Sequence, residues 1–260
     1  MAEWKRRSKL YTPKQQEPFK LSRSKIELFV ECPRCFFLDR RLGISRPSLP
    51  GFSLNSAVDF LLKKEFDLLR DKKEAHELMN RYKIDAIPFS HPLIEEWRTN
   101  FTGQQYLEPR TNFIIFGAVD DVWETREKEL LIVDYKSTST DKAISLDDEY
   151  KQGYKRQMEV YQWLFRNNSF KVSSTGYFVF ANAGKTKPRF DGVLEFELSI
   201  IPYTGDDKWV LPTLFKIKEC LDSDTIPQPS EKCEHCVFKE AKILGVKEII
   251  KTPEPLRMDF

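Results

Sequence analysis

The sequence lacks long hydrophobic segments. No run approaches the ~20 consecutive apolar residues that a membrane-spanning helix requires. The N-terminal segment MAEWKRRSKLYTPKQQ also lacks the apolar core of a secretory signal peptide. These absences predict a soluble, cytoplasmic protein that has no membrane partner. A phosphate-binding G-x-x-x-x-G-K-[ST] loop is absent as well, so any ATP-driven step would need another polypeptide.

Net charge is also small, but it is unevenly distributed. The whole chain carries a formal charge of +2, whereas residues 1–25 hold eight Lys or Arg and only two Glu. We therefore expect residues 1–20 to form a flexible basic arm that meets phosphate groups, with a solubilising tail as the alternative. Residues 21–245 are predicted to form a single domain, followed by a C-terminal tail over 246–260.

The composition is typical of a globular protein. Hydrophobic residues make up 40% of the 260 residues and aromatic residues 13%, enough for one good core. Periodicity predicts a long helix over 54–82, with Leu62, Phe66 and Leu69 on one face, and further helices over 147–168 and 207–221. Strands are expected over 112–124, 129–138, 175–184 and 189–200, the first two as an antiparallel hairpin. The order of elements predicts a mixed α/β fold.

Two predicted strands end in charged residues. Along LLIVDYKST, Asp134 and Lys136 point to the same face, ~6.5 Å apart, and Tyr135 points to the other. Asp120 ends the preceding predicted strand, shortly after Gly117. If the two strands pair, the two carboxylates converge, which is unfavourable unless a cation lies between them, and carboxylate oxygens favour Mg²⁺ or Mn²⁺. The alternative is a surface ion pair between Asp134 and Lys136.

A third pattern lies on the following helix. Gln157 and Tyr161 are four residues apart, so they share a helix face with Tyr154 and Leu164. Ordinary packing of an aromatic helix face explains the tyrosines well, but it explains Gln157 less well.

Together these patterns resemble the RecB-like branch of the PD-(D/E)XK nuclease superfamily. Gly117 and Asp120 match its G-x-x-D motif, Asp134 and Lys136 its acidic residue–x–lysine motif, and Gln157 and Tyr161 its Q-x-x-x-Y motif. The resemblance implies a restriction-endonuclease-like core, with a central mixed β-sheet flanked by helices. It also implies Mg²⁺- or Mn²⁺-dependent hydrolysis of single- or double-stranded DNA, and a helicase or another DNA-processing protein as a partner.

The resemblance also implies roles for individual residues. Asp120, Asp134 and the Tyr135 carbonyl would hold the metal, while Lys136 would position water or stabilise developing charge. In the family, the Gln157 and Tyr161 positions are thought to orient the lysine or to contact the DNA backbone. Many relatives carry a metal-binding histidine on the first long helix, where this sequence has Asp59. We interpret Asp59 as an oxygen ligand that replaces it, or as a solvated residue beside the apolar stripe.

The chain contains five cysteines, and four of them form two C-x-x-C pairs, Cys32/Cys35 and Cys233/Cys236. The two pairs predict four thiolates on one metal, with buried free cysteines as the alternative. Spacing alone favours zinc. The family resemblance, including the CRISPR-adaptation nucleases, favours an iron–sulfur cluster, although those relatives carry one N-terminal and three C-terminal cysteines. Cys220 is predicted to pack in a helix, and His235 is a reserve ligand.

Three functions remain compatible with the sequence. The leading hypothesis is a metal-dependent DNA nuclease. A catalytically silent nucleic-acid-binding or structural module with the same fold and metal site is the first alternative. The second is a zinc-dependent interaction protein in which the acidic residues are scattered in space.

Overall fold

The computed structural model describes residues 9–47 and 51–244, and the chain folds into two compact units. The first unit comprises Met1–Lys14, Leu28–Ser48 and Glu219–Phe260. The second comprises Gln15–Glu27 and Leu49–Lys218. The four paired cysteines therefore belong to the first unit, and the predicted acidic site belongs to the second.

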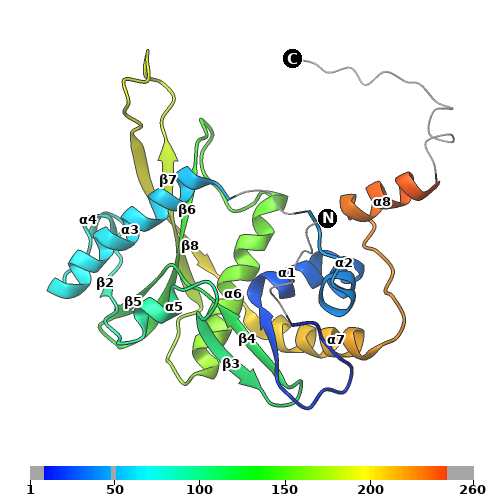
Figure 1. The fold of residues 1–260 in the computed structure, drawn as a ribbon. Coiled ribbons are helices and arrows are strands. Elements are labelled where there is room, and N and C mark those ends of the chain that lie inside the picture. The colour runs from blue at the N-terminus through cyan, green and yellow to red at the C-terminus, as the bar shows by residue number, and fades with distance from the viewer. Residues whose placement is uncertain (1–8, 48–50, 245–260) are drawn as a thin grey trace. The chain divides into compact units, whose positions relative to one another are not determined.

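A five-stranded mixed sheet forms the centre of the second unit (Figure 1), in the order β2-β5-β6-β7-β8. Its strands are β2 (Ala86–Pro88), β5 (Asp121–Thr125), β6 (Leu130–Thr138), β7 (Thr175–Ala183) and β8 (Phe196–Thr204). β6 pairs with β5 antiparallel and with β7 parallel, while β2–β5 and β7–β8 are antiparallel. This arrangement confirms the predicted mixed α/β fold class.

The helices of the chain are short except for two. They are α1 (Arg23–Glu31), α2 (Pro33–Phe37), the π-helix η1 (Leu38–Leu42), α3 (Ser53–Lys72), α4 (Glu77–Arg81), α5 (Ile94–Trp97), α6 (Gln152–Asn167), α7 (Val210–Asp222) and α8 (Glu234–Leu244), with 3₁₀ turns η2 (Glu149–Lys151) and η3 (Asp207–Trp209). The two long helices, α3 and α6, both contact the central strand β6.

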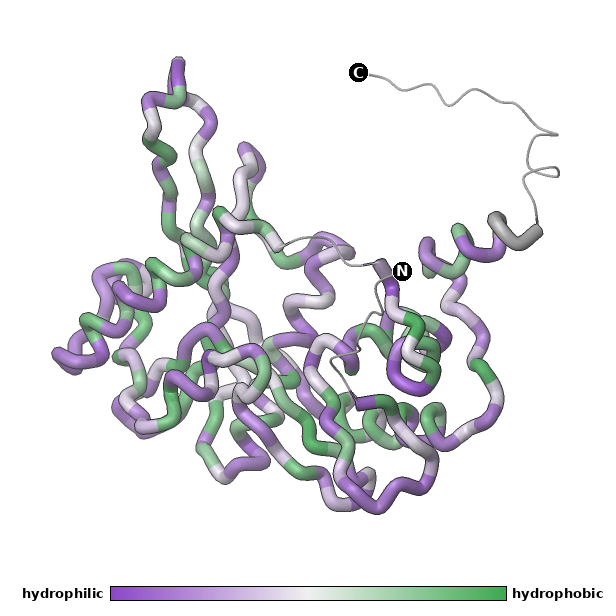
Figure 2. Tube along the Cα trace, in the orientation of Figure 1, coloured by the Kyte–Doolittle hydropathy of each residue, from purple (hydrophilic) through white to green (hydrophobic). Residues whose placement is uncertain are grey.

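Alternation along β6 sends its side chains to two different helices. Leu131, Val133 and Tyr135 join a buried apolar cluster with Phe66 of α3. Asp134, between them in sequence, instead accepts a hydrogen bond from Gln157 of α6. Figure 2 colours the same trace by hydropathy and shows hydrophobic and hydrophilic residues interspersed along it. Because a strand alternates faces, one nine-residue strand builds the core on one side and presents charged groups on the other.

The predicted strand over 112–124 is split between two sheets. Its first part is β4 (Phe113–Gly117), which pairs with β1 (Phe19–Ser22) and β3 (Gln104–Glu108) in a separate three-stranded sheet. Its second part is β5, which forms the expected hairpin with β6. Between them the chain turns away from sheet pairing, and the Val119 N–H donates to the Trp97 carbonyl at 3.0 Å. No proline marks this break in the sequence, so the sequence predicts one uninterrupted strand over 112–124.

Two other predicted boundaries differ from the structure. The helix expected over 54–82 ends at Lys72, because Lys73 adopts a left-handed conformation (φ 58°) and His76 caps the separate helix α4. The last strand begins at Phe196 rather than near residue 189. Asp191 and Gly192 both have positive φ, and the Val193 N–H donates to the Phe190 carbonyl, so a tight turn precedes the strand.

The first unit packs residues 9–14, which belong to the segment that we expected to be flexible. Tyr11 is buried, and its hydroxyl donates to Asp222 at 2.7 Å. Residues 9–14 are therefore held in place, and β1 already begins at Phe19. Residues 1–8 of the predicted arm and the predicted tail over 246–260 lie outside the described residues, so these domain boundaries stay predictions. In the described part of the chain, no helix combines the length and apolar character that a membrane span needs.

Candidate active site and metal centre

The structure places Asp120 and Asp134 beside one another. Asp120 lies just before β5, and its Oδ2 accepts a hydrogen bond from the Tyr135 N–H at 2.9 Å. Asp134 precedes Tyr135 on β6 and is fully buried. Burial raises the pKa of Asp134 to about 6, the charge of Lys136 lowers it, and the charge of Asp120 raises it. Two acids from neighbouring segments therefore interact electrostatically.

Lys136 forms an ion pair with Asp134, and its ammonium lies 4.8 Å from the centre of the Tyr154 ring. The Lys136 side chain is 17% exposed and the Asp134 side chain 0%, so this is not a surface ion pair. Burial acts to lower the pKa of Lys136, but the charges of Asp134 and Asp120 outweigh it and raise the pKa. Lys136 is therefore a charged, positioned ammonium.

Gln157 and Tyr161 are connected to the acids. The Gln157 side-chain amide donates to Asp134 Oδ1 at 2.9 Å and to the Tyr161 hydroxyl at 3.0 Å. The contact of Gln157 is thus with the carboxylate that pairs with Lys136, rather than with the lysine itself.

Gly117 leaves the space that the Tyr161 ring fills. A Cβ atom at Gly117 would lie 2.5 Å from Tyr161 Cε1, far inside van der Waals contact. The glycine of the G-x-x-D pattern and the tyrosine of the Q-x-x-x-Y pattern are therefore packing partners. This contact gives a physical reason for the absence of a side chain at residue 117.

Asp59 lies close to the acids but is separated from Asp120 by a lysine. Lys63 Nζ lies 2.8 Å from Asp59 Oδ2 and 3.2 Å from Asp120 Oδ1. Asp59 is partly exposed, at 36% of its side chain, and burial together with the charge of Asp120 raises its pKa. Sequence reasoning missed Lys63, although its position one helical turn after Asp59 was a usable signal.

A buried arginine network fixes the backbone next to Asp120. Asp121 is fully buried and accepts from Arg70, from Arg98 Nη2 at 3.1 Å, and from the Tyr135 hydroxyl at 2.8 Å. Arg98 Nε also donates to the Asp120 carbonyl at 3.1 Å.

The same guanidinium reaches helix α3. Arg98 Nη1 donates to both carboxylate oxygens of Asp67, each at 2.9 Å. One side chain thus ties the Asp120 backbone to the helix that carries Asp59 and Lys63. These arginines were not predicted, because their partners come from distant segments of the chain.

The acidic residues fit a hard divalent cation. Asp134 Oδ2 is buried and forms no hydrogen bond, although Lys136 lies in ion-pair contact with it. Each carboxylate oxygen has two lone pairs, so Asp120 and Asp134 retain acceptor capacity beyond the contacts described. Together with a backbone carbonyl, such oxygens are the ligands that Mg²⁺ and Mn²⁺ prefer.

The four paired cysteines come together in the first unit. Their sulfur atoms all lie within 4.8 Å of one another, and in the described residues this is the only group of three or more metal-ligating side chains gathered so closely. The Sγ–Sγ distances are 3.8 Å for Cys32–Cys236 and 3.6 Å for both Cys35–Cys233 and Cys35–Cys236. Cys220 is not part of the group, and the exposed His235 is not part of it either.

The surroundings act differently on the individual thiols: the pKa of Cys32 is lowered, whereas burial raises the pKa values of Cys35 and Cys236. Burial raises the pKa of Cys32, but hydrogen bonds from the backbone of Cys35 and Ser230 outweigh it, so that the pKa falls to about 6. Arg46 Nη2 donates to Cys233 Sγ at 3.5 Å, and Nη1 pairs with Glu31 at 2.6 Å. The arrangement is therefore suited to a soft cation that binds thiolates.

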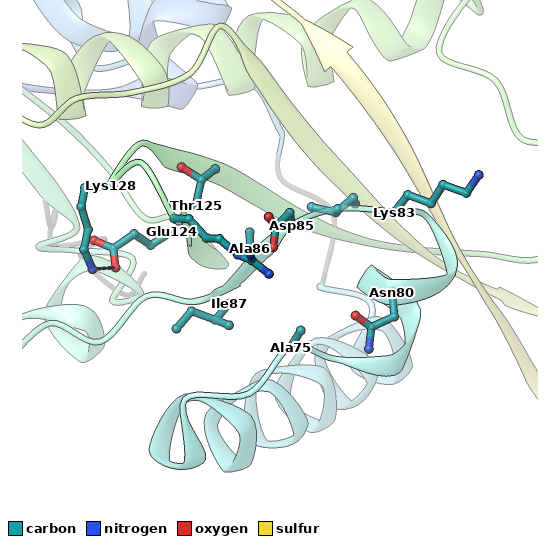
Figure 3. A pocket seen from close by; sticks show the side chains of 11 residues that line it. Ala75, Asn80, Lys83, Asp85, Ala86, Ile87, Glu124, Thr125 and Lys128 are labelled. Atoms are coloured by element: carbon teal, nitrogen blue, oxygen red, sulfur yellow. Dashed lines mark hydrogen bonds and ion pairs between the residues drawn. The ribbon is translucent and has the colours of Figure 1, made fainter.

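A separate pocket lies elsewhere in the second unit. It measures about 650 Å³, and Figure 3 shows its lining side chains, with an ion pair of 2.9 Å between Lys128 and Glu124. None of the predicted site residues lines it, and its polar side chains do not converge on a reactive group.

Comparison with known proteins supports the assignment of the motifs. The family model described as the PD-(D/E)XK nuclease superfamily matches residues 54–241, which include the acidic site and two of the four clustered cysteines. No curated protein matches the sequence. Among solved structures, the crystal structure of SSO0001 is similar at 14% identity over 88% of this chain and 87% of that chain, with a TM-score of 0.33. That similarity is too distant to bear on fold or function.

Proposed function

Because the chain belongs to the PD-(D/E)XK nuclease superfamily, we propose that it is a metal-dependent deoxyribonuclease that hydrolyses phosphodiester bonds. One observation carries the proposal: a fully buried aspartate, Asp134, lies beside Asp120 and pairs with Lys136 on the same strand. A module that only binds nucleic acid gains nothing from acids that face phosphate, since they repel it.

The carboxylates of Asp120 and Asp134 and the carbonyl of Tyr135 would hold Mg²⁺ or Mn²⁺. When bound, such an ion polarises the scissile phosphate and lowers the pKa of a water ligand. The hydrogen bond from the Tyr135 N–H to Asp120 keeps that carboxylate aligned with the end of β6. The ligands are thereby positioned before any ion or substrate arrives.

Lys136 supplies the positive charge that the reaction needs. Its ammonium is held between Asp134 and the Tyr154 ring, so it can orient the attacking water or stabilise negative charge that develops on the phosphate. Gln157 and Tyr161 act as positioning residues, because Gln157 donates to Asp134 and to Tyr161. They hold the orientation of the carboxylate on which Lys136 depends.

The substrate and branch are proposed from the motifs. Gly117, Asp120, Asp134, Lys136, Gln157 and Tyr161 follow the RecB-like pattern, which supports single- or double-stranded DNA as the substrate. The cationic residues of the segment 1–25 support contact with phosphate. A helicase or another DNA-processing protein remains the proposed partner, because the chain has no ATP-binding loop of its own.

The test is cleavage of labelled single- and double-stranded DNA with Mg²⁺ or Mn²⁺. We expect Lys136→Ala and Asp134→Asn each to reduce the rate by a hundredfold or more, since each removes a group that acts on the transition state. Lys128→Ala, which changes an exposed lysine outside the site, is the matched control. Equal rates for the wild type and Lys136→Ala would favour the catalytically silent binding module instead.

For the four clustered cysteines we propose one tetrahedral Zn²⁺ ion. Zinc–thiolate bonds of about 2.3 Å place tetrahedral sulfurs about 3.8 Å apart, and the three measured separations are 3.6–3.8 Å. In an iron–sulfur cluster the thiolates bind several different iron atoms, which bridging sulfides join, and this separates the cysteine sulfurs more widely. The family resemblance, in contrast, favours an iron–sulfur cluster.

Metal analysis of protein purified without oxygen separates the two possibilities. We expect one zinc ion per chain and a colourless protein. Iron together with absorbance near 400 nm would instead establish the cluster. Cys233→Ser should lose the metal, and Cys220→Ser, which changes a cysteine outside the group, should retain it.

A further inference from the structure

Lys63 places a cation between two acidic residues next to the proposed metal site. Its ammonium is 2.8 Å from Asp59 Oδ2 and 3.2 Å from Asp120 Oδ1, so it bridges two carboxylates from different elements. Asp59 is on α3 and Asp120 precedes β5. In nucleases with two metal ions, the acidic side chains of the site surround two cations that lie about 3.5–4 Å apart.

The surroundings of Lys63 hold it in this position. Its side chain is 19% exposed, and it lies one helical turn after Asp59, an i,i+4 spacing that favours the ion pair. Its two carboxylate partners, Asp59 at 2.8 Å and Asp120 at 3.2 Å, hold the ammonium between them.

The charges of the site leave no need for a second divalent ion. Asp59, Asp120 and Asp134 are matched by Lys63 and Lys136, which leaves one negative charge among the five groups. One divalent ion then makes the site positive, as binding of a phosphodiester requires, whereas a second ion would add two further charges without a counter-charge.

We propose that Lys63 is a built-in substitute for the second metal ion, so that the acidic site binds one divalent ion rather than two. Asp59 then serves as the counter-ion of Lys63, and the single ion is held by Asp120, Asp134 and the Tyr135 carbonyl. The inference rests on the proposed metal site, but it does not require that the protein cleaves DNA.

The test counts Mn²⁺ ions bound per chain, by titration followed with electron paramagnetic resonance at neutral pH. Wild type should bind one Mn²⁺. Lys63→Met, which removes the charge and keeps the length of the side chain, should bind two, and the pair should show spin coupling because such ions lie about 3.5–4 Å apart. Lys64→Met, at an exposed neighbour on the same helix, should bind one.

Each other outcome has a defined meaning. Two ions in the wild type, or the same number in wild type and Lys63→Met, would overturn the inference. No ion in the wild type would contradict the proposed metal site and would overturn the inference with it. If Lys63→Met does not fold, Asp59→Asn decides: it should still bind one ion, and loss of that ion would make Asp59 a ligand and overturn the proposal.

Discussion

The molecule contains two clusters of ligand groups, and they differ in how their charge is balanced. In the first unit, four cysteine sulfurs lie within 4.8 Å of one another, and one arginine, Arg46, donates to one of them. In the second unit, lysines pair with the carboxylates: Lys63 with Asp59 and Asp120, and Lys136 with Asp134. Charge balance in the cysteine cluster would require a metal ion from solution. In the acidic cluster, lysine side chains of the protein itself balance most of the carboxylate charge.

On the proposed function, this difference separates a structural role from a catalytic one. Four cysteines that share a single arginine contact would bind a metal as part of folding. Carboxylates that are already paired keep their geometry without one, and they can therefore bind and release an ion with each substrate. Stability should depend on the first cluster and activity on the second.

Removal of metal is the strongest test of this comparison. A chelator that strips the cysteine site should lower the melting temperature by 10 °C or more, since thiolate-bound metal contributes directly to folding. Omission of Mg²⁺ or Mn²⁺ should abolish cleavage and change the melting temperature by only a few degrees. Thermal unfolding followed by circular dichroism measures both, and Cys220→Ser serves as the control. A larger shift from Mg²⁺ omission than from the chelator would reverse the comparison.

Arg98→Met should disturb the pairing of buried charges in the second unit. It removes a cation from the fully buried Asp121 and a hydrogen bond from the Asp120 carbonyl. Loss of one partner of a buried ion pair costs about 3–5 kcal/mol of unfolding free energy. Urea denaturation checks the value, and Arg126→Met, at an exposed arginine, should cost less than about 1 kcal/mol. A cost for Arg98→Met as small as that of the control would mean that Arg70 alone balances Asp121.

The smallest effect concerns the cysteine that stands outside the cluster. Burial and the charge of Glu219 raise the pKa of Cys220 to about 11. Because a raised pKa keeps the thiol protonated, alkylation should be slow at neutral pH and should rise about tenfold per pH unit between pH 7 and 10. Mass spectrometry of iodoacetamide-treated, metal-loaded protein measures the rate. A plateau near pH 9 would indicate an ordinary thiol and contradict the burial of Cys220.

The sequence was most informative where one strand or helix carries the whole signal. Asp134, Tyr135 and Lys136 follow each other on β6, so alternation alone assigned their faces, and Tyr135 does lie in the apolar cluster with Phe66. Gln157 and Tyr161 lie one turn apart on α6, so their shared face was also predictable. The paired cysteines were found from spacing and do come together.

Features that depend on contacts between distant segments were missed. The break between β4 and β5 has no proline to mark it and is supported by hydrogen bonds to Trp97 and Arg98. The three-stranded sheet pairs residues near 20 with residues near 115, which no local pattern reports. Lys63 and Arg98 have acidic partners up to 57 residues away, so only the folded structure reveals their roles.

The order of the cysteines along the chain has a consequence for biosynthesis. Cys35 and Cys233 flank the whole of Leu49–Lys218, which belongs to the second unit. During translation the first pair of cysteines is therefore synthesised long before the second. The middle of the chain can fold before the second pair is available. The proposed ion can therefore bind all four thiolates only late, after synthesis has passed Cys236. A product that terminates before the second pair of cysteines would keep the acidic residues but could not bind the metal through four thiolates.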